Sequence, residues 1–139
     1  MLDGSTALAW CFEDEGTDEV TAVMRRAAAE GALVPSIWRL EVANGLMVGM
    51  RRGRMSEATR GVMLNAFAAM DIAVDPETTD RAWSSILGIA ERHRLTLYDA
   101  SYLELAFRRA VPLATLDAAM ARAASALGVP LILPRTASA

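Results

Sequence analysis

The chain has 139 residues, a net charge of −3 and 53% hydrophobic residues, so it is long enough for one folded domain and too apolar for a disordered protein. All 14 basic residues are arginine, which excludes mechanisms that need a lysine, among them the P-loop nucleotide hydrolases. No apolar run reaches the roughly 18 residues of a membrane span, and a single cysteine permits no intrachain disulfide, so we expect a cytoplasmic protein.

Short apolar segments alternate with longer helical segments along the whole chain. In chain order, the first half predicts an apolar start that leads into Asp3, helices over 6–12 and up to Glu30, a strand over 32–34, and helices over 36–52 and 56–70. The second half predicts a strand over 72–74, helices after Asp75 and over 97–110, a strand over 111–115, a helix over 117–128 and a strand over 129–133. Such alternation predicts an α/β fold whose mostly parallel sheet is covered on both faces. We expect one domain over 1–134 and a flexible tail over 135–139.

Residues typical of helix ends accompany these boundaries. Ser36 and Ser56 are expected to cap the helices that follow them, and Asp75 is an expected N-cap because Pro76 suits the first helical position. Gly31 is the expected C-terminal cap of the helix that ends at Glu30.

Three aspartates lie where an α/β sheet places its ligands. Asp3 and Asp117 each follow an apolar segment and precede a helix, and Asp99 lies in the first turn of helix 97–110. Ligands bind at the carboxyl ends of parallel strands, so these positions suit a functional site. Each residue also has an ordinary explanation, because Asp3 and Asp117 suit helix N-caps and the spacing from Thr96 to Asp99 suits a capping box.

A fourth acid, Glu41, lies beside an apolar helix face. Glu41 and Asn44 share one stripe of helix 36–52, next to a stripe that we expect to pack inward: Leu40, Ala43, Met47 and Met50. Burial of an unpaired carboxylate is unfavourable by several kcal/mol, so Glu41 needs a metal, a cation or a proton. An ion pair with Arg39 at the edge of the stripe is the alternative.

Taken together, four carboxylates in one place would repel one another and raise each other's pKa values. Hard divalent cations such as Mg²⁺ or Mn²⁺ relieve this repulsion and prefer oxygen ligands. Such a site suits the binding of phosphate oxygens and the activation of water.

Four short motifs give the chain a resemblance to PIN-domain ribonuclease toxins of the VapC type, from bacterial toxin–antitoxin pairs. They lie at 2–10 (LDGSTALAW), 40–46 (LEVANGL), 95–103 (LTLYDASYL) and 113–117 (LATLD). The resemblance implies a three-layer α/β/α sandwich with about five parallel strands. It also implies that Mg²⁺ or Mn²⁺ is held by an acidic cluster with polar neighbours, here Asp3, Glu41, Asp99 and Asp117, supported by Ser5, Asn44 and Thr115.

The activity and partners that this resemblance implies are hydrolysis of RNA phosphodiester bonds, a homodimer, and a VapB-type antitoxin that covers the acidic site. Members of the family usually carry several residues before the first aspartate, whereas two precede Asp3 here, so we expect either a natural start upstream of Met1, a trimmed chain, or, if Met1 is the true start, a short first strand. A PIN-like module that binds RNA or protein without cleavage, and a phosphohydrolase that acts on DNA or nucleotides, are the alternatives. RNA is favoured by the resemblance alone.

Arginines and tryptophans offer further candidate surfaces. The arginines gather over 51–54, 92–94 and 108–109, where cations suit helix C-termini and where a minority could contact RNA phosphates. Trp10, Trp38 and Trp83 lie in helical patterns, and we expect core or interface positions rather than base-stacking platforms.

Overall fold

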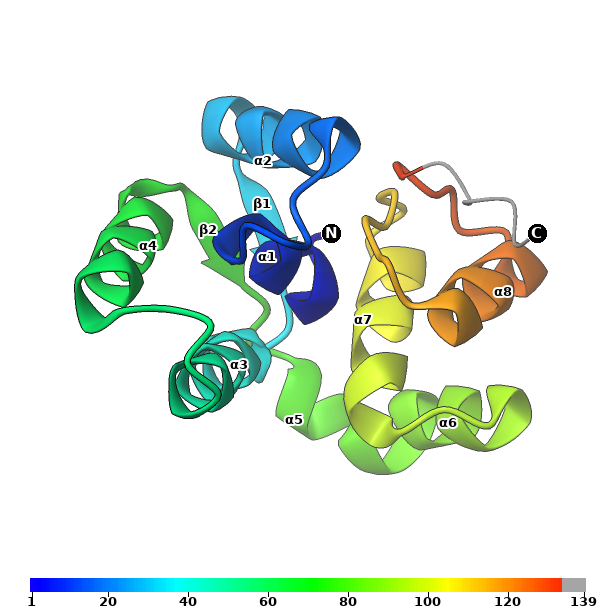
Figure 1. Ribbon diagram of the computed structural model, residues 1–139. Coiled ribbons are helices and arrows are strands. Elements are labelled where there is room, and N and C mark those ends of the chain that lie inside the picture. Colours follow the sequence, from blue (N-terminus) through cyan, green and yellow to red (C-terminus); the bar gives the residue numbers. More distant parts are fainter. Residues whose placement is uncertain (134–139) are drawn as a thin grey trace.

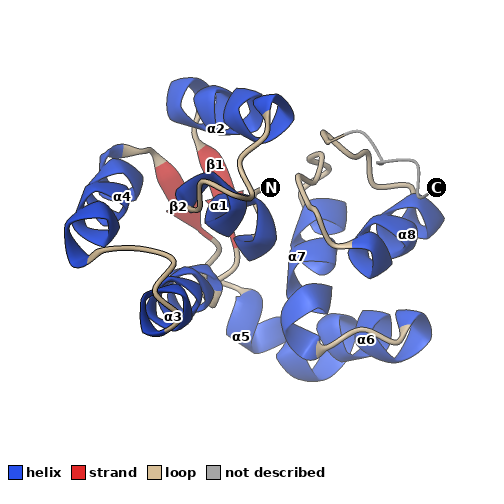
Figure 2. Ribbon diagram, in the orientation of Figure 1, coloured by secondary structure: helices blue, strands red, loops and turns tan. Residues whose placement is uncertain are grey.

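A computed structural model describes residues 1–133; the expected tail over 135–139 lies outside the described residues. Helices dominate the fold, and two short strands lie among them (Figure 2). The helices are α1 (Gly4–Cys11), α2 (Asp18–Glu30), α3 (Trp38–Arg51), α4 (Glu57–Ala69), α5 (Thr78–Arg81), the π-helix η1 (Ala82–Ile86), α6 (Leu87–His93), α7 (Leu97–Arg108) and α8 (Ala118–Leu127). Within residues 1–133, no helix is long and apolar enough to cross a membrane.

The strands β1 (Ala32–Val34) and β2 (Ile72–Val74) pair in parallel, as the alternation of segments predicts. Single parallel bridges join Leu2 to Ala114 and Leu113 to Leu131, and the Leu2 N–H donates to the Leu33 carbonyl at 3.3 Å. Five segments therefore run side by side in the order 72–74, 32–34, 2, 113–114 and 131. Within the described part of the chain, only 72–74 and 32–34 are full strands. The predicted strands over 111–115 and 129–133 are therefore wrong in length, because each is reduced to isolated bridges.

The helices surround this narrow strand region. Figure 1 shows α3 and α4 on one side of β1 and β2, α6, α7 and α8 on the other, and α1 between the two groups. The largest fully buried apolar side chains come from the first segment, α2, β1, α3, α7, the segment at 113 and α8: Leu2, Val20, Met24, Val34, Leu46, Tyr102, Leu103, Leu105, Leu113 and Met120. Segments from both ends of the described chain therefore share one core, and Leu2 is part of it.

Most of the predicted helix caps are present. Ser56 and Asp117 accept hydrogen bonds from backbone N–H groups of the helices that follow them, and Gly31 ends α2 at a φ of 83°. The cap at Ser36 is wrong, because α3 begins after Ile37 without a side-chain cap and the Ser36 N–H donates to Thr78 Oγ1 at 3.1 Å.

The predicted cap at Asp75 is also wrong. Helix α5 begins after Glu77, and the Asp75 side chain is fully buried. Its carboxylate accepts a hydrogen bond from Arg108 Nη2 at 2.8 Å and another from Thr78 Oγ1 at 3.0 Å. The charge of the buried Asp75 carboxylate is thus balanced by Arg108 of α7. This pairing cannot be inferred from the residues next to Asp75 in the sequence.

The buried face of α3 differs from the prediction. Its buried residues are Trp38, Val42, Leu46 and Gly49. Leu40 is 74% exposed and Met47 is 40% exposed, so the stripe expected to pack inward lies mainly in solvent. The argument that Glu41 interrupts a buried stripe was therefore wrong, because the spacing is compatible with either face of this helix and tertiary packing selected the other.

Candidate functional site

Asp3 ends the first segment of the sheet and caps α1. Its side chain is buried, with 1% of the residue exposed, and it accepts from the Thr6 N–H at 2.9 Å and from Ser5 Oγ at 2.8 Å. Thr115 Oγ1 donates a further hydrogen bond to it. Burial raises the pKa of Asp3, and these hydrogen bonds act in the opposite direction. Hydrogen bonds from α1 and from Thr115 thus hold this carboxylate, although the expected first strand is reduced to a single bridge at Leu2.

Ser5 and Thr115 connect Asp3 to the segment that contains the last acid. Ser5 Oγ accepts from the Leu116 N–H at 3.1 Å, and Thr115 Oγ1 accepts from the Asp117 N–H at 3.1 Å. Both hydroxyls therefore join the start of α1 to the start of α8. Their predicted positions beside the acids agree with this geometry.

Asp99 lies in the first turn of α7, and Asp117 is the N-cap of α8. Asp117 caps α8 by accepting from the Met120 N–H at 2.8 Å, and the Asp99 N–H donates to Thr96 Oγ1 at 3.1 Å. Burial and the charge of Asp117 raise the pKa of Asp99. The capping explanations are thus correct, and they are compatible with a shared site because the helix N-termini carry partial positive charge that favours carboxylates.

Glu41 lies in the first turn of α3 and is half-buried. Its partner is Tyr102 of α7, whose hydroxyl donates to Glu41 Oε2, and no ion pair to Arg39 exists among the described residues. A Cβ placed on Gly4 would lie 3.6 Å from Oε2 of Glu41, so the start of α1 lies against this carboxylate. Tyr102 was not singled out from the sequence, although it lies three residues after Asp99 on the same helix.

The four acids act on one another electrostatically. Burial raises the pKa of Glu41, and the charges of Asp99 and Asp3 raise it further, while the Tyr102 hydroxyl opposes the shift. Asp117 acts on Asp99 in the same way. Four segments far apart in the sequence therefore bring their carboxylates into one negative region, and among residues 1–133 no ion pair joins Glu41, Asp99 or Asp3 to a cation.

The donor set fits a hard divalent cation in its chemistry. All candidate ligands are oxygen atoms, and a divalent cation would remove the repulsion that raises the pKa values. Among residues 1–133, no three acidic, histidine or cysteine side chains are already arranged to hold an ion. An ion bound here would therefore have to draw carboxylates inward from the positions described above.

Asn44 is exposed rather than part of the acid cluster. It lines a groove between α1 and α3 together with Ser5 and Asp117, and this groove extends to Arg54. Asn44, the predicted supporting residue, thus lines a groove that Asp117 also lines.

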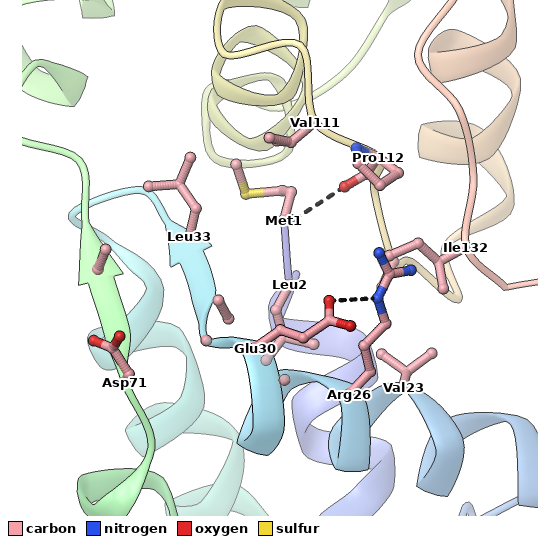
Figure 3. A pocket seen from close by; sticks show the side chains of 15 residues that line it. Met1, Leu2, Val23, Arg26, Glu30, Leu33, Asp71, Val111, Pro112 and Ile132 are labelled. Atoms are coloured by element: carbon pink, nitrogen blue, oxygen red, sulfur yellow. Dashed lines mark hydrogen bonds and ion pairs between the residues drawn. The ribbon is translucent and has the colours of Figure 1, made fainter.

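A separate cavity of about 340 Å³ is lined by Met1 and Leu2 together with Leu33 and Pro112 (Figure 3). The Met1 ammonium group donates to the Pro112 carbonyl at 3.0 Å, and Arg26, which also lines the cavity, pairs with Glu30 at 2.9 Å. None of the four candidate acids lines this cavity. The cavity is therefore distinct from the candidate site that the acids form.

Comparison with known proteins gives two findings. The model of a family described as PIN domain matches residues 1–126. Among solved structures, the fold is similar to PAE2754 from Pyrobaculum aerophilum, with a TM-score of 0.64 and 22% sequence identity over 88% of this chain and 76% of that chain. At that identity, the likeness concerns the fold alone. Among curated proteins, the chain has no significant match.

Proposed function

Because the match over residues 1–126 shows that the chain belongs to the PIN domain family, a nuclease-type fold, we propose that it is a metal-dependent endoribonuclease. The observation that carries this proposal is the convergence of Asp3, Glu41, Asp99 and Asp117 from four separate segments, each acid coupled by charge to at least one other. The proposed reaction is hydrolysis of an RNA phosphodiester bond.

The proposed division of labour follows from the contacts. Bound Mg²⁺ or Mn²⁺ would supply an activated water and would stabilise charge on the phosphoryl oxygens. Ser5 and Thr115 hold Asp3, and Tyr102 holds Glu41, so that two of the proposed ligands have fixed orientations. The first turn of α7 presents Asp99, and the N-cap position of α8 presents Asp117. No covalent nucleophile is required.

Cleavage of single-stranded RNA tests the proposal. The wild-type protein should cleave labelled RNA with Mg²⁺ or Mn²⁺ and should lose this activity in excess EDTA. Asp99→Asn keeps the size of the side chain and removes its charge, so we expect activity to fall at least a hundredfold. Asp18→Asn, at an exposed position at the start of α2, is the matched control. Full cleavage in EDTA or by Asp99→Asn would rule the proposal out.

We also propose that this endoribonuclease is the toxin of a toxin–antitoxin pair. In this proposal it acts in the cytoplasm as a homodimer, and its partner is a VapB-type antitoxin. The support is the resemblance of the four acidic motifs to the VapC type. Expression of the wild type should arrest bacterial growth, and Asp99→Asn should not. Sedimentation velocity measures the oligomeric state and should show a dimer. Co-purification with the product of the adjacent gene tests whether the chain binds an antitoxin.

One observation favours a second candidate, a PIN-like module that binds RNA or protein without cleavage. No three ligands among residues 1–133 are arranged to hold an ion as they stand. A titration with Mn²⁺ separates the two functions, because a nuclease site should lose Mn²⁺ affinity in Glu41→Gln and a pure binding module should show no Glu41-dependent Mn²⁺ binding. Matched DNA and RNA substrates test the phosphohydrolase alternative.

A further inference from the structure

A second pocket lies beside the acids and is chemically unlike them. It has a volume of about 340 Å³ and lies between the start of α3, the α5–η1 segment and the start of α7. Its apolar wall consists of Ile37, Ala82, Ile86, Leu97 and the ring of Tyr98. None of the described residues that line it carries a charge. A phosphate group would therefore find no cation there, whereas an uncharged planar group would find an apolar wall.

The pocket and the acidic site share two helices. Leu97 and Tyr98 directly precede Asp99 at the start of α7. Ile37 lies one helical turn before Glu41 on α3. Residues that line the pocket and two of the candidate acids therefore lie at the starts of the same two helices.

Polar groups in the lining suit the edge of a nucleobase. The side chains of Ser36 and Thr79 contribute hydroxyls, and both residues are exposed. Tyr98 is 62% exposed, so its ring is available for stacking. Pockets for small ligands typically combine an apolar wall with a few polar groups, and unpaired RNA bases stack on aromatic side chains.

The wall opposite Tyr98 has an unusual backbone. Ala82 and Ile86 belong to η1, a π-helix that separates α5 from α6. π-helical turns are rare and occur frequently at functional sites. The same turn presents Trp83, which is 92% exposed and therefore not a core residue, so an interface position for it stays a prediction.

We propose that this pocket binds one unpaired nucleobase of the RNA, adjacent to the phosphate that is held at the acids. This proposal rests on the proposed nuclease function and extends it to single-stranded substrates, whose bases are free to leave a stack. Tyr98 would then be a specificity-determining residue that contacts substrate, without a part in the hydrolysis.

Binding of RNA without cleavage tests the pocket directly. The cut position in a short single-stranded RNA is first mapped with wild-type protein and Mg²⁺. Affinities are then measured by fluorescence anisotropy with Ca²⁺ in place of Mg²⁺, under conditions in which a gel shows no cleavage, for the intact RNA and for RNAs with one abasic residue on either side of the cut. For the wild type, we expect the abasic residue on one side to weaken binding about tenfold, in line with the stacking of one base on an aromatic ring.

The variants separate the pocket from the rest of the surface. Tyr98→Ala should weaken binding of the intact RNA about tenfold and should abolish the abasic effect, whereas Tyr98→Phe should preserve both. Ala82→Leu narrows the pocket from the opposite wall, away from Asp99, and should repeat the loss. Phe107→Ala, at an exposed aromatic position on the same helix α7, is the matched control and should behave as the wild type.

Other outcomes overturn the proposal in distinguishable ways. An abasic effect that persists in both Tyr98→Ala and Ala82→Leu would assign the base to another surface and leave the nuclease function intact. If Tyr98→Ala dissociates a dimer in sedimentation velocity while RNA discrimination is unchanged, this face is an interface between copies and not a base pocket. A wild-type protein that neither cleaves nor binds single-stranded RNA would overturn both proposals.

Discussion

The hydroxyl of Tyr102 donates a hydrogen bond to Glu41 Oε2 and thereby joins α7 to α3 across the acidic site. Tyr102 is 1% exposed, so its hydroxyl has little access to water. Burial, this hydrogen bond and the nearby acidic charges raise the pKa of Tyr102 well above its ordinary value. The phenol therefore remains a donor throughout the neutral range, and Tyr102 acts as a positioning residue for Glu41.

Replacement of this donor should weaken metal binding. Tyr102→Phe keeps the ring in the core and removes the hydroxyl, so Glu41 loses its orientation and its pKa rises further. We expect Mn²⁺ affinity to fall about 10–100-fold, the range typical for loss of a group that orients a metal ligand. Isothermal titration calorimetry measures this effect without RNA.

The second tyrosine of the chain supplies the control. Tyr98 is 62% exposed, so Tyr98→Phe should leave Mn²⁺ affinity unchanged. Equal Mn²⁺ affinity in wild type and Tyr102→Phe would show that the hydrogen bond does not position a ligand.

The pH dependence of cleavage should respond to Thr115. Burial raises the pKa of Asp3, and the hydroxyl of Thr115 lowers it by donating to the carboxylate. Thr115→Val removes this donor, so the pKa of Asp3 should rise further and more of the acid should be protonated at a given pH. Because the carboxylate form binds a metal, the acid limb of the pH–rate profile should move to higher pH, and activity should recover at alkaline pH.

The profile is measured from single-turnover cleavage rates at saturating Mn²⁺. Thr59→Val, at an exposed position on α4, is the control and should leave the acid limb of the pH–rate profile unchanged. A shift toward lower pH in Thr115→Val would contradict the assigned role.

Local features of the fold were predictable because they depend on residues near in sequence. The caps at Ser56 and Asp117 and the strand over 72–74 follow from such short-range preferences. The acids Asp3 and Asp117 were placed beside helix starts for the same reason. Their approach to one another follows from the rule that parallel strands place their carboxyl ends at one edge.

Long-range partners were not predictable from spacing. The buried face of α3 depends on which neighbours pack against it, so the stripe that contains Leu40 was misplaced. Asp75 has the pattern of a cap, yet its partner Arg108 is 33 residues away. Tyr102 and Glu41 are separated by 61 residues, and no local pattern records their contact.

The buried pair of Asp75 and Arg108 should be important for stability. Arg108 Nη2 lies 2.8 Å from Asp75 Oδ2, with 13% and 0% of the side chains exposed, and Arg108 Nε lies 2.9 Å from Glu104 Oε1. Arg108→Leu would leave the buried Asp75 carboxylate without its cation, although Glu104 keeps Arg81 at 3.5 Å, and this should destabilise the fold by about 3–5 kcal/mol at pH 7. Urea denaturation measures the loss, and Arg109→Leu, at an exposed neighbouring position, should have little effect.

The sign of the pH dependence distinguishes this pair from ordinary packing. Burial acts to raise the pKa of Asp75. The hydrogen bonds from Arg108 and Thr78 and the charge of Arg108 outweigh burial, so the pKa is lowered overall. In the wild type, this contribution to stability is present above the ordinary pKa of an aspartate and is lost as the pH falls through the lowered value. In Arg108→Leu, burial is opposed only by the hydrogen bonds from Thr78 and the Glu77 N–H, so the pKa of Asp75 rises and acidification relieves the destabilisation. The difference between the two proteins should therefore shrink between pH 7 and pH 4.5, and Asp75→Asn should partly rescue Arg108→Leu.

The close approach of α1 to α3 should depend on Gly49. A Cβ placed there would lie 2.4 Å from the ring of Phe12, which is 4% exposed and lies beneath the Arg54 guanidinium at 4.2 Å. Gly49→Ala should overpack this contact and destabilise the fold by about 1–3 kcal/mol. A Cβ added at Gly61, on α4, would instead point into open space, so Gly61→Ala should stabilise the fold by about 0.5–1 kcal/mol through helix propensity.

The two glycine variants also test how packing positions the acids. Helix α1 begins beside Asp3 and α3 begins beside Glu41, so a displacement at Gly49 should separate the two carboxylates. Under conditions in which both variants remain folded by circular dichroism, Gly49→Ala should lose both Mn²⁺ affinity and RNA cleavage, whereas Gly61→Ala should retain them. Wild-type stability and activity in Gly49→Ala would show that Phe12 yields without moving α1, and that this contact does not set the distance between Asp3 and Glu41.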